Sequence, residues 1–365
     1  MGLPALGSPI EDIETPCLVL DLDPFERNIR SMSEYCRSNG VEWRPHSKCH
    51  KSIEIARRVV DAGGIGVTCA KLGEAEVMAS GGVTDLLIAN PLAGDKRLRR
   101  LVELRRIADP ITLVDHIDHV TALSAATESG GVSIRTLIEV DIGMARCGTA
   151  PGEPTIELAR AINEAPGLDL AGIMGYEGHL LRIPDPEEKE RSIARAIALL
   201  ADTKALFDRA GLPCPIVSAG GTGSYHYTAR QPGVTEMQAG GGIFMDLFYR
   251  DECGISDLEI ALKVHATVTS RPTKDRAIID AGRKTLDHNI HMPEVASRDD
   301  VRFQSLSAEH GVLTVTHGAG PRIGERIEII LGYGDMTTML HDHFCGVRNG
   351  KLEAIWPLDA RGRLS

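Results

Sequence analysis

The chain has 365 residues, with 40 Lys and Arg against 51 Asp and Glu, and a formal net charge of −11 at pH 7. That charge repels a phosphate backbone, so we expect no nucleic-acid partner and favour a small-molecule substrate. No apolar run reaches the roughly 18 residues of a membrane-spanning helix, so no membrane partner is expected. The eight cysteines are scattered without a CxxC pair, and the amino terminus lacks the features of a signal peptide. These observations predict a cytoplasmic protein.

The predicted elements begin with a strand at 17–20 and a helix that Asp23 caps and Pro24 opens. From residue 42 onward, short apolar segments alternate with segments of helical periodicity. The predicted strands are 42–46, 66–69, 85–89, 111–114, 135–140, 171–175, 215–218 and 235–238, and the helices lie near 52–61, 72–80, 95–107, 117–128, 153–165, 186–210 and 222–230. Eight such repeats are typical of an α/β fold of the (β/α)8, TIM-like barrel type. A doubly wound sheet is the alternative, but no GxGxxG motif opens its first helix.

After about residue 255 the pattern changes to strand-like segments separated by turns. The dipeptide Asn349-Gly350 lies between two such segments and is typical of a β-hairpin. The sequence therefore predicts three parts. Residues 1–22 form an arm and a strand that joins the β domain, residues 23–254 form the barrel, and residues 255–365 form a mainly β domain.

Lys48 lies in the basic segment 44–51, directly after the first predicted barrel strand, where barrel enzymes carry their chemistry. His46 and His50 flank this lysine. Partial burial among positive groups lowers the pKa of a lysine and favours the amine form, which condenses with aldehydes. An exposed lysine on a basic loop is the alternative.

Two glycine-rich turns follow the seventh and eighth predicted strands, at 218–224 and 240–242. Glycines let backbone amides converge on a phosphate, hydroxyl groups add donors, and barrels often bind phosphate between these two loops. A reactive lysine and a phosphate site at one barrel mouth predict pyridoxal 5′-phosphate (PLP). The candidate cofactor-binding residues are Lys48, His46, Arg146, Tyr176, Ser218, Gly220, Gly221, Thr222, Gly223, Gly240 and Gly241.

Further candidates follow the fifth and sixth predicted strands. Arg146 is expected to contact the cofactor ring, with a surface ion pair as the alternative. Tyr176 is expected to face the ring, and Glu177 or His179 to move protons. Each of these residues could also have a purely structural function, and their shared place at strand ends favours the catalytic interpretation.

Six segments together resemble the D-threonine aldolase and eukaryotic-type D-serine dehydratase family, which includes the 3-hydroxy-D-aspartate aldolases. The segments are 44–51, 139–148, 218–225, 238–240, 279–282 and 348–357. The resemblance extends from about Glu14 to the carboxyl end and implies an alanine-racemase-like PLP barrel of fold type III, a β domain and a homodimer. It also implies Lys48 as the Schiff-base lysine, Arg146 and Tyr176 at the cofactor, and the glycines as the phosphate cradle.

The resemblance further implies a divalent metal (Mn, Mg or Zn) held by a His-x-Asp or His-x-Cys pair. Here Tyr333 stands at the histidine position and Asp335 is retained, so Asp335 is the remaining metal-ligand candidate. Tyrosine is a poor ligand unless it is deprotonated, and its reference pKa is about 10; Tyr333 is therefore a candidate acid–base group. His341 and His343 would share one face of an extended segment and are the nearby imidazoles.

The activity that the resemblance implies is that of a PLP-dependent lyase, which cleaves a β-hydroxy-D-amino acid into glycine and an aldehyde. Dehydration of D-serine or D-3-hydroxyaspartate is an alternative, and so is racemisation of an amino acid. A PLP-binding protein without turnover is the rival from outside the enzymes.

Overall fold

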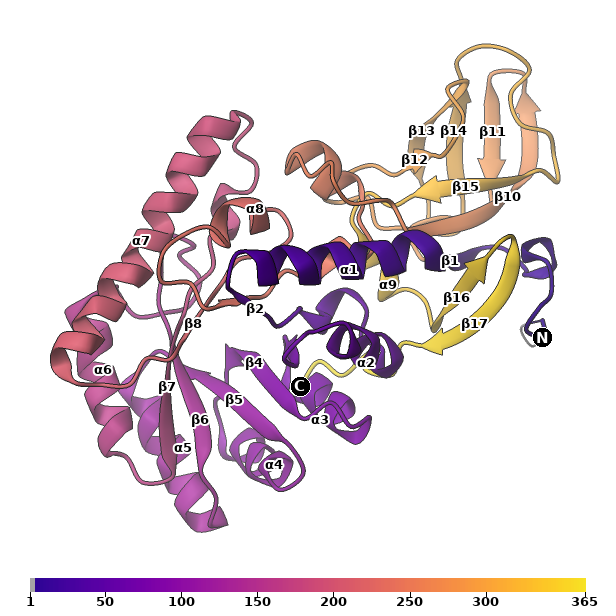
Figure 1. Ribbon diagram of the computed structural model, residues 1–365. Coiled ribbons are helices and arrows are strands. Elements are labelled where there is room, and N and C mark those ends of the chain that lie inside the picture. The colour runs from indigo at the N-terminus through magenta and orange to yellow at the C-terminus, as the bar shows by residue number, and fades with distance from the viewer. Residues whose placement is uncertain (1–3) are drawn as a thin grey trace. The chain divides into compact units, whose positions relative to one another are not determined.

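The computed structural model describes residues 4–365, and the chain divides into two compact units (Figure 1). The barrel unit comprises Met32–Gly240 and Gly362–Ser365. The β unit comprises the chain up to Ser31 and Gly241–Arg361. Helix α1 (Leu22–Ser38) contains the boundary at Ser31. The three-part division drawn from the sequence stays a prediction.

The barrel unit is built on eight parallel strands in the order β2-β9-β8-β7-β6-β5-β4-β3. A bridge between His46 and Thr68 joins the two ends of this sheet, and the Thr68 amide donates to the Pro45 carbonyl at 2.9 Å. The predicted TIM-like barrel is therefore confirmed. The strands are β2 (Glu42–Trp43), β3 (Val67–Cys69), β4 (Asp85–Pro91), β5 (Asp109–Val114), β6 (Ile134–Glu139), β7 (Leu168–Met174), β8 (Ile216–Ala219) and β9 (Glu236–Met237).

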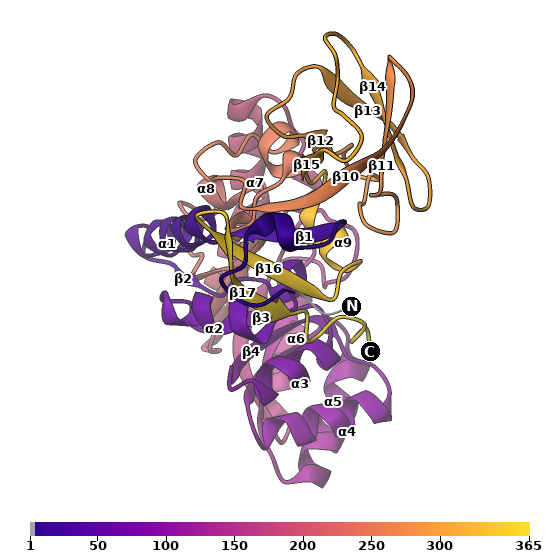
Figure 2. The ribbon, with the colours of Figure 1, turned by 90° about the vertical axis from the view of Figure 1, so that its right-hand side faces the viewer.

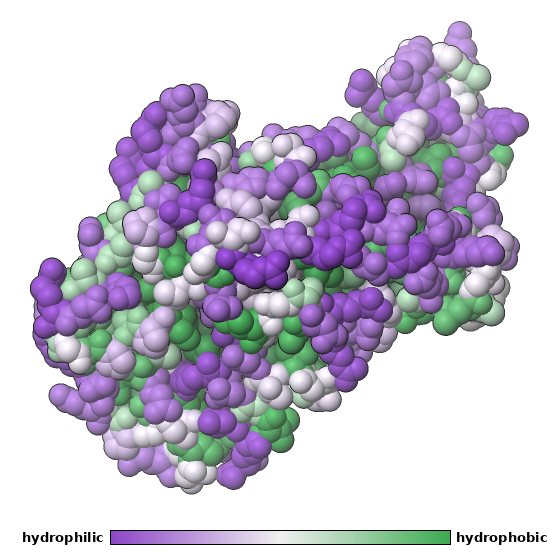
Figure 3. All heavy atoms as spheres, viewed as in Figure 1, coloured by the Kyte–Doolittle hydropathy of each residue, from purple (hydrophilic) through white to green (hydrophobic). Residues whose placement is uncertain are grey.

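Helices follow the barrel strands and lie around the outside of the sheet (Figure 1). The longest, α7 (Pro186–Ala210), begins at Asp185, whose carboxylate accepts from the Glu188 amide at 2.7 Å, and ends at Gly211 with φ 68°. Hydrophilic residues cover its first turns (Figure 3). The other barrel helices are α2 (Ile53–Asp61), α3 (Leu72–Ser80), α4 (Asp95–Arg105), α5 (Ile117–Gly130), α6 (Glu153–Glu164) and α8 (Tyr225–Thr228).

A layer of charged side chains fills the barrel interior near the strand starts. The Arg44 guanidinium donates to Glu236 and to Asp85, each at 2.8 Å, and its side chain is 2% exposed. Arg135 also reaches Asp85, at 2.6 Å. Glu236 in turn accepts from the Ser218 hydroxyl at 2.7 Å. The buried charges of Arg44 and Glu236 are therefore paired, as the low dielectric of an interior requires.

The β unit is a nine-stranded sheet with the main order β13-β14-β11-β10-β1-β16-β17, and β15 pairs with β10 and β12. The strand expected at 17–20 is β1 (Cys17–Asp21), which pairs antiparallel with β10 and parallel with β16. Figure 2 shows β1 beside β16 and β17. The other strands are β10 (Leu262–Thr273), β11 (Arg276–Ile279), β12 (Glu294–Val295), β13 (Val301–Leu306), β14 (Gly311–Val315), β15 (Arg326–Ile330), β16 (His343–Arg348) and β17 (Lys351–Pro357). Asn349 and Gly350 form the predicted hairpin turn between β16 and β17.

Two local predictions were wrong. Helix α1 begins at Leu22, before Asp23, and it is the Asp21 carboxylate that accepts from the Asp23 amide, at 3.2 Å. The Asp23 carboxylate instead pairs with Arg348. The helix expected at 222–230 is reduced to α8, because the Ser224 hydroxyl bonds back to Gly221 and holds the preceding residues in a turn.

Within residues 4–365 every helix is too short or too polar to cross a membrane.

Candidate cofactor and active site

Lys48 lies on a single 3-10 turn, η2 (Ser47–Cys49), directly after β2. His46 caps this turn, because its Nδ1 accepts from the Lys48 amide at 3.3 Å. The Ser47 hydroxyl donates to the Thr68 carbonyl at 3.0 Å and ties the turn to β3. Lys48 is half-buried. The predicted lysine therefore stands on a fixed turn at the carboxyl end of a barrel strand.

The His46 imidazole is neutral. Burial holds its pKa well below the ordinary value of 6.5, and the positive charges of Lys48, Lys51, His50 and Arg146 lower it further. Because Nδ1 accepts a hydrogen bond, the ring proton is on Nε2. His46 therefore sits beside Lys48 without adding positive charge to it.

The second lysine of the segment, Lys51, has a structural function. Its backbone is left-handed, with φ 50°, and its ammonium pairs with the carboxylate of Glu74, whose side chain is fully buried. Glu74 also accepts from the amides of Ala70 and Lys71, at 2.5 and 3.0 Å. This buried ion pair fixes the chain just after the Lys48 turn.

His50 gives a testable pH dependence of stability. Its Nδ1 accepts from the Ser52 amide at 3.0 Å, and burial followed by the charge of Lys51 lowers its pKa to about 3. A lowered histidine pKa means that the unfolded chain binds the additional proton, so stability falls as the pH falls below 6.5. Between pH 6.5 and 5 this one group lowers the unfolding free energy by about 1.5 kcal/mol.

We expect His50→Asn, which keeps an acceptor near Nδ1 but cannot titrate, to remove that part of the pH dependence. Urea unfolding of both proteins at pH 6.5 and 5 measures it. A matched control is His310→Asn in the β unit, where the histidine is exposed. Equal pH slopes for wild type and His50→Asn would contradict the assignment.

Tyr176 lies between two glycines at the end of β7. A Cβ at Gly221 would stand 3.1 Å from the Tyr176 hydroxyl, and one at Gly178 would stand 3.0 Å from its ring carbon Cζ. Tyr176 itself is half-buried. The first glycine-rich turn therefore packs directly on the ring expected to face the cofactor.

The second glycine-rich turn approaches the Lys48 turn. A Cβ at Gly240 would stand 2.7 Å from the His46 nitrogen, so only glycine fits there. Gly220 has φ 80°, a left-handed conformation that favours glycine. Thr222 is buried within the first turn. Gly241 belongs to the β unit, where a Cβ would stand 2.7 Å from the Tyr249 ring.

The hydrogen bonds of Glu177 and Ser218 indicate structural functions, which differ from those expected. Glu177 is buried, and its Oε1 accepts from the hydroxyls of Ser224 and Thr228 at 2.6 and 2.5 Å, which braces the glycine-rich turn. The Ser218 hydroxyl donates to Glu236 in the barrel interior. Ser224 and Thr228 were not among the residues expected from the sequence, although Ser224 is the last residue of the glycine-rich turn at 218–224.

Arg146 lies in the loop after β6, with its side chain 50% exposed. The Asp141 carboxylate fixes this loop by accepting from the amides of Gly143 and Ala145, at 2.9 and 3.0 Å. The Arg146 guanidinium reaches Glu139 at 3.3 Å, and burial raises the pKa of that carboxyl. The loop of Arg146 follows β6 and the Lys48 turn follows β2, so both lie at the carboxyl ends of parallel barrel strands. His179 lies against Gly143, where a Cβ would stand 2.8 Å from its Nε2.

Tyr333 and Asp335 lie at the start of α9 (Gly334–Thr338) in the β unit. The Tyr333 hydroxyl donates to Asp335 at 2.9 Å, and its ring packs against Phe248 and Tyr249. Asp246 accepts from the Gly334 amide at 2.8 Å, and burial raises its pKa to about 7.

The histidines near Asp335 do not form the expected pair. His341 precedes β16 and its Nε2 donates to the Thr285 carbonyl at 3.0 Å, whereas His343 begins the strand. Among residues 4–365 no group of three or more His, Cys, Asp and Glu side chains is arranged to hold a metal ion. Asp335 as a metal ligand stays a prediction.

The residues of the barrel unit do fit PLP. A Cβ at Gly240 would meet His46 and one at Gly221 would meet Tyr176, so glycines let these two turns lie close against the Lys48 turn and the Tyr176 ring. Lys48, Arg146 and Tyr176 would hold the aldehyde and ring, and the glycine-rich turns would hold the phosphate.

Two family models match the chain. Residues 20–247 match the alanine racemase N-terminal domain, and residues 261–347 match a serine dehydratase domain.

Single relatives match over nearly the whole length. A 3-hydroxy-D-aspartate aldolase from Paracoccus denitrificans (strain Pd 1222) is 36% identical, over 99% of this chain and 96% of its own. The crystal structure of D-threonine aldolase from Filomicrobium marinum has a TM-score of 0.97 and 38% identity, with 100% of both chains covered. A D-threo-3-hydroxyaspartate dehydratase from Delftia sp. (strain HT23) is 33% identical, over 74% of this chain and 72% of its own.

Proposed function

We propose, from the premise that this chain belongs to the alanine racemase N-terminal domain family and groups there with the D-threonine and 3-hydroxy-D-aspartate aldolases, that it is a PLP-dependent lyase. Its reaction is retro-aldol cleavage of a β-hydroxy-D-amino acid into glycine and an aldehyde. The observation that carries the proposal is the fixed Lys48 turn together with the glycines that pack against His46 and Tyr176, where a Cβ would not fit.

PLP supplies an aldehyde that condenses with amines and an electron-poor ring that stabilises negative charge on the α-carbon of an amino acid. We assign Lys48 as the residue that would hold the aldehyde and that would hold a proton at Nζ when its amine is free. Arg146 and Tyr176 orient the ring. Glu177 keeps the glycine-rich turn in place through Ser224 and Thr228.

Cleavage of the bond between the α- and β-carbons requires a base for the proton of the β-hydroxyl group. We assign this function to Tyr333 with Asp335. The Tyr333 hydroxyl already donates to the Asp335 carboxylate, so it can pass its own proton to Asp335 as it takes the proton of the substrate. The family resemblance supports this assignment, because it implies that the metal-binding pair of the family stands at these two positions.

Dehydration is the second candidate reaction, favoured by the match of residues 261–347 to a serine dehydratase domain. In this reaction Lys48 would remove the α-proton and the β-hydroxyl would leave as water. Racemisation would need no β-hydroxyl chemistry. The homodimer and the cytoplasmic location expected from the sequence belong to the same proposal, and light scattering of the purified protein tests the first.

A product assay with D-threonine separates the reactions. We expect equal amounts of glycine and acetaldehyde, because loss of the β-hydroxyl proton leads to cleavage of the carbon–carbon bond. L-Threonine is the control and should give no product. Ammonia and 2-oxobutanoate would instead identify a dehydratase, and L-allo-threonine as the only product would identify a racemase, which inverts the α-carbon alone; either result would overturn the proposed cleavage.

A further inference from the structure

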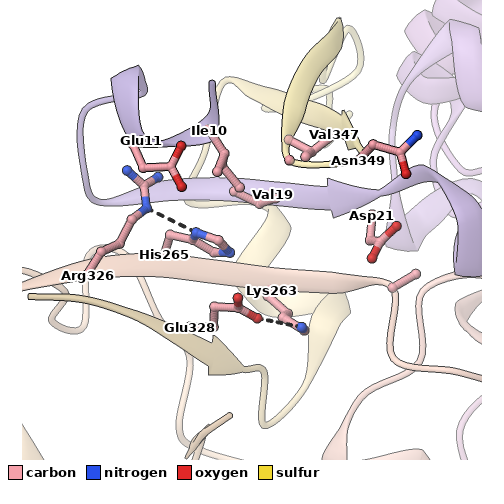
Figure 4. Close-up of a pocket in the computed structure, with 12 residues that line it drawn as sticks. Ile10, Glu11, Val19, Asp21, Lys263, His265, Arg326, Glu328, Val347 and Asn349 are labelled. Atoms are coloured by element: carbon pink, nitrogen blue, oxygen red, sulfur yellow. Dashed lines mark hydrogen bonds and ion pairs between the residues drawn. The ribbon is translucent and has the colours of Figure 1, made fainter. Parts of the chain in front are cut away.

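The β unit carries a cavity of about 390 Å³ on one face of its sheet (Figure 4). It lies between the short helix η1 (Ile10–Asp12), strands β1, β10 and β15, and the hairpin turn at Asn349. Its volume is within the range of about 300–1,000 Å³ typical of small-molecule sites. The proposed lyase chemistry uses none of its residues.

Strand register gives this cavity one charged wall and one apolar wall. Lys263 and His265 are two residues apart on β10, so both side chains face the same side of the sheet. His265 pairs directly with Glu328 of β15, and Lys263 with Val19 of β1. Val19 belongs to an apolar cluster against which Ile10 packs. A ligand in the cavity would therefore meet charges on one side and aliphatic groups on the other.

His265 presents a fixed donor to the cavity. Only 5% of this residue is exposed, and the Arg326 Nε donates to its Nδ1 at 3.1 Å. Because arginine only donates, Nδ1 accepts and the proton of the neutral ring is on Nε2. His265 lines the cavity, and Figure 4 shows its ring between Arg326 and the middle of the cavity. An N–H in this place can donate to an acceptor on a ligand.

Charges of both signs surround that donor. Lys263 pairs with Glu328 at 2.6 Å and, with three donor hydrogens, can serve a second acceptor. The carboxylate of Asp21 also lines the cavity, on the side away from Arg326, and that of Glu11 lies near Arg326 (Figure 4). The lining includes more carboxylates than cationic groups, so a simple anion is disfavoured and a ligand with its own positive charge is favoured.

We propose that this cavity binds a free α-amino acid with an aliphatic side chain, in its zwitterionic form. The ligand carboxylate accepts from His265 Nε2 and Lys263 Nζ. Its ammonium group pairs with Asp21, and its side chain lies against Ile10 and Val19. This site is separate from the chemistry of Lys48 and does not depend on the proposed lyase reaction.

Calorimetric titration of the purified wild-type protein with D- and L-norvaline tests the proposal. Norvaline is zwitterionic and aliphatic and has no β-hydroxyl to react. We expect saturable binding of at least one enantiomer, and binding about tenfold weaker or worse for pentanoate and butylamine, which each lack one charge. Absence of norvaline binding, or equal binding of pentanoate, would overturn the proposal.

Variants locate the site. Lys263→Met and Asp21→Asn should each weaken norvaline binding by about tenfold, the loss of one charged hydrogen bond. Lys284→Met, which removes an exposed lysine paired with Glu309, is the matched control and should leave it unchanged. Lys48→Ala tests whether norvaline binds at the Lys48 site of the barrel unit instead. Binding that survives Lys48→Ala but is lost in Lys263→Met supports the cavity, whereas the reverse pattern assigns norvaline to the barrel and contradicts it.

Discussion

Replacing Lys48 with alanine is expected to abolish the visible absorption of lysine-bound PLP and to lower kcat/KM for D-threonine by about 1,000-fold or more. Lys48 is the half-buried lysine on the turn that His46 caps, whereas Lys51 is committed to the buried carboxylate of Glu74. Lys51 can therefore not replace Lys48 without breaking this ion pair. Absorption spectra and initial rates of the purified variant measure both effects.

Lys48→Arg is the matched control, because it keeps the positive charge and the turn but cannot condense with an aldehyde. It should show the same loss of absorption and activity while its circular dichroism and unfolding midpoint stay near those of wild type. A Lys48→Ala protein that remained yellow and active would show that another residue holds the cofactor.

The largest effect on stability is expected from Arg44→Met. This change leaves the buried Glu236 carboxylate without the guanidinium that donates to it at 2.8 Å. Loss of one partner of a buried ion pair costs about 3–5 kcal/mol, because the remaining charge stays in a low dielectric. Urea unfolding followed by circular dichroism gives the difference in unfolding free energy.

Arg100→Met is the control within the same unit. Arg100 donates to Glu76 through two nitrogens, at 2.8 and 2.7 Å, but both side chains are partly exposed. Exposed pairs contribute about 0–1 kcal/mol, so this variant should stay close to wild type. The double variant Arg44→Met/Glu236→Gln should recover part of the loss, since no unpaired charge remains. An Arg44→Met cost no larger than that of Arg100→Met would contradict the account.

The barrel was predictable from sequence because its signals are local and repeated. The apolar segment 85–89 followed by the helical pattern at 95–107 corresponds to β4 and α4, and the alternation recurs around the sheet. The two wrong helix predictions involve polar side chains whose hydrogen bonds to the backbone compete with the hydrogen bonds of a regular helix. Ser224 bonds to Gly221 and shortens the helix that the sequence predicts, and Asp21 accepts the bond expected of Asp23.

The candidate site was predictable in position but less so in the function of each residue. Strand ends meet at one edge of a barrel, so Lys48, Arg146 and Tyr176 could be grouped from their places after strands. The hydrogen bonds of Glu177 reach Ser224 and Thr228, which are 47 and 51 residues further along the chain. No local pattern reveals such partners, and only the folded chain shows that Glu177 braces a loop.

The most direct test of the Lys48 assignment is borohydride reduction of the purified protein, followed by proteolysis and peptide mass spectrometry. Reduction makes the bond between the cofactor and its lysine permanent. We predict a phosphopyridoxyl group on Lys48 alone. A label on Lys51 or on any other lysine, or a protein that takes up no label when PLP is supplied, would contradict the account.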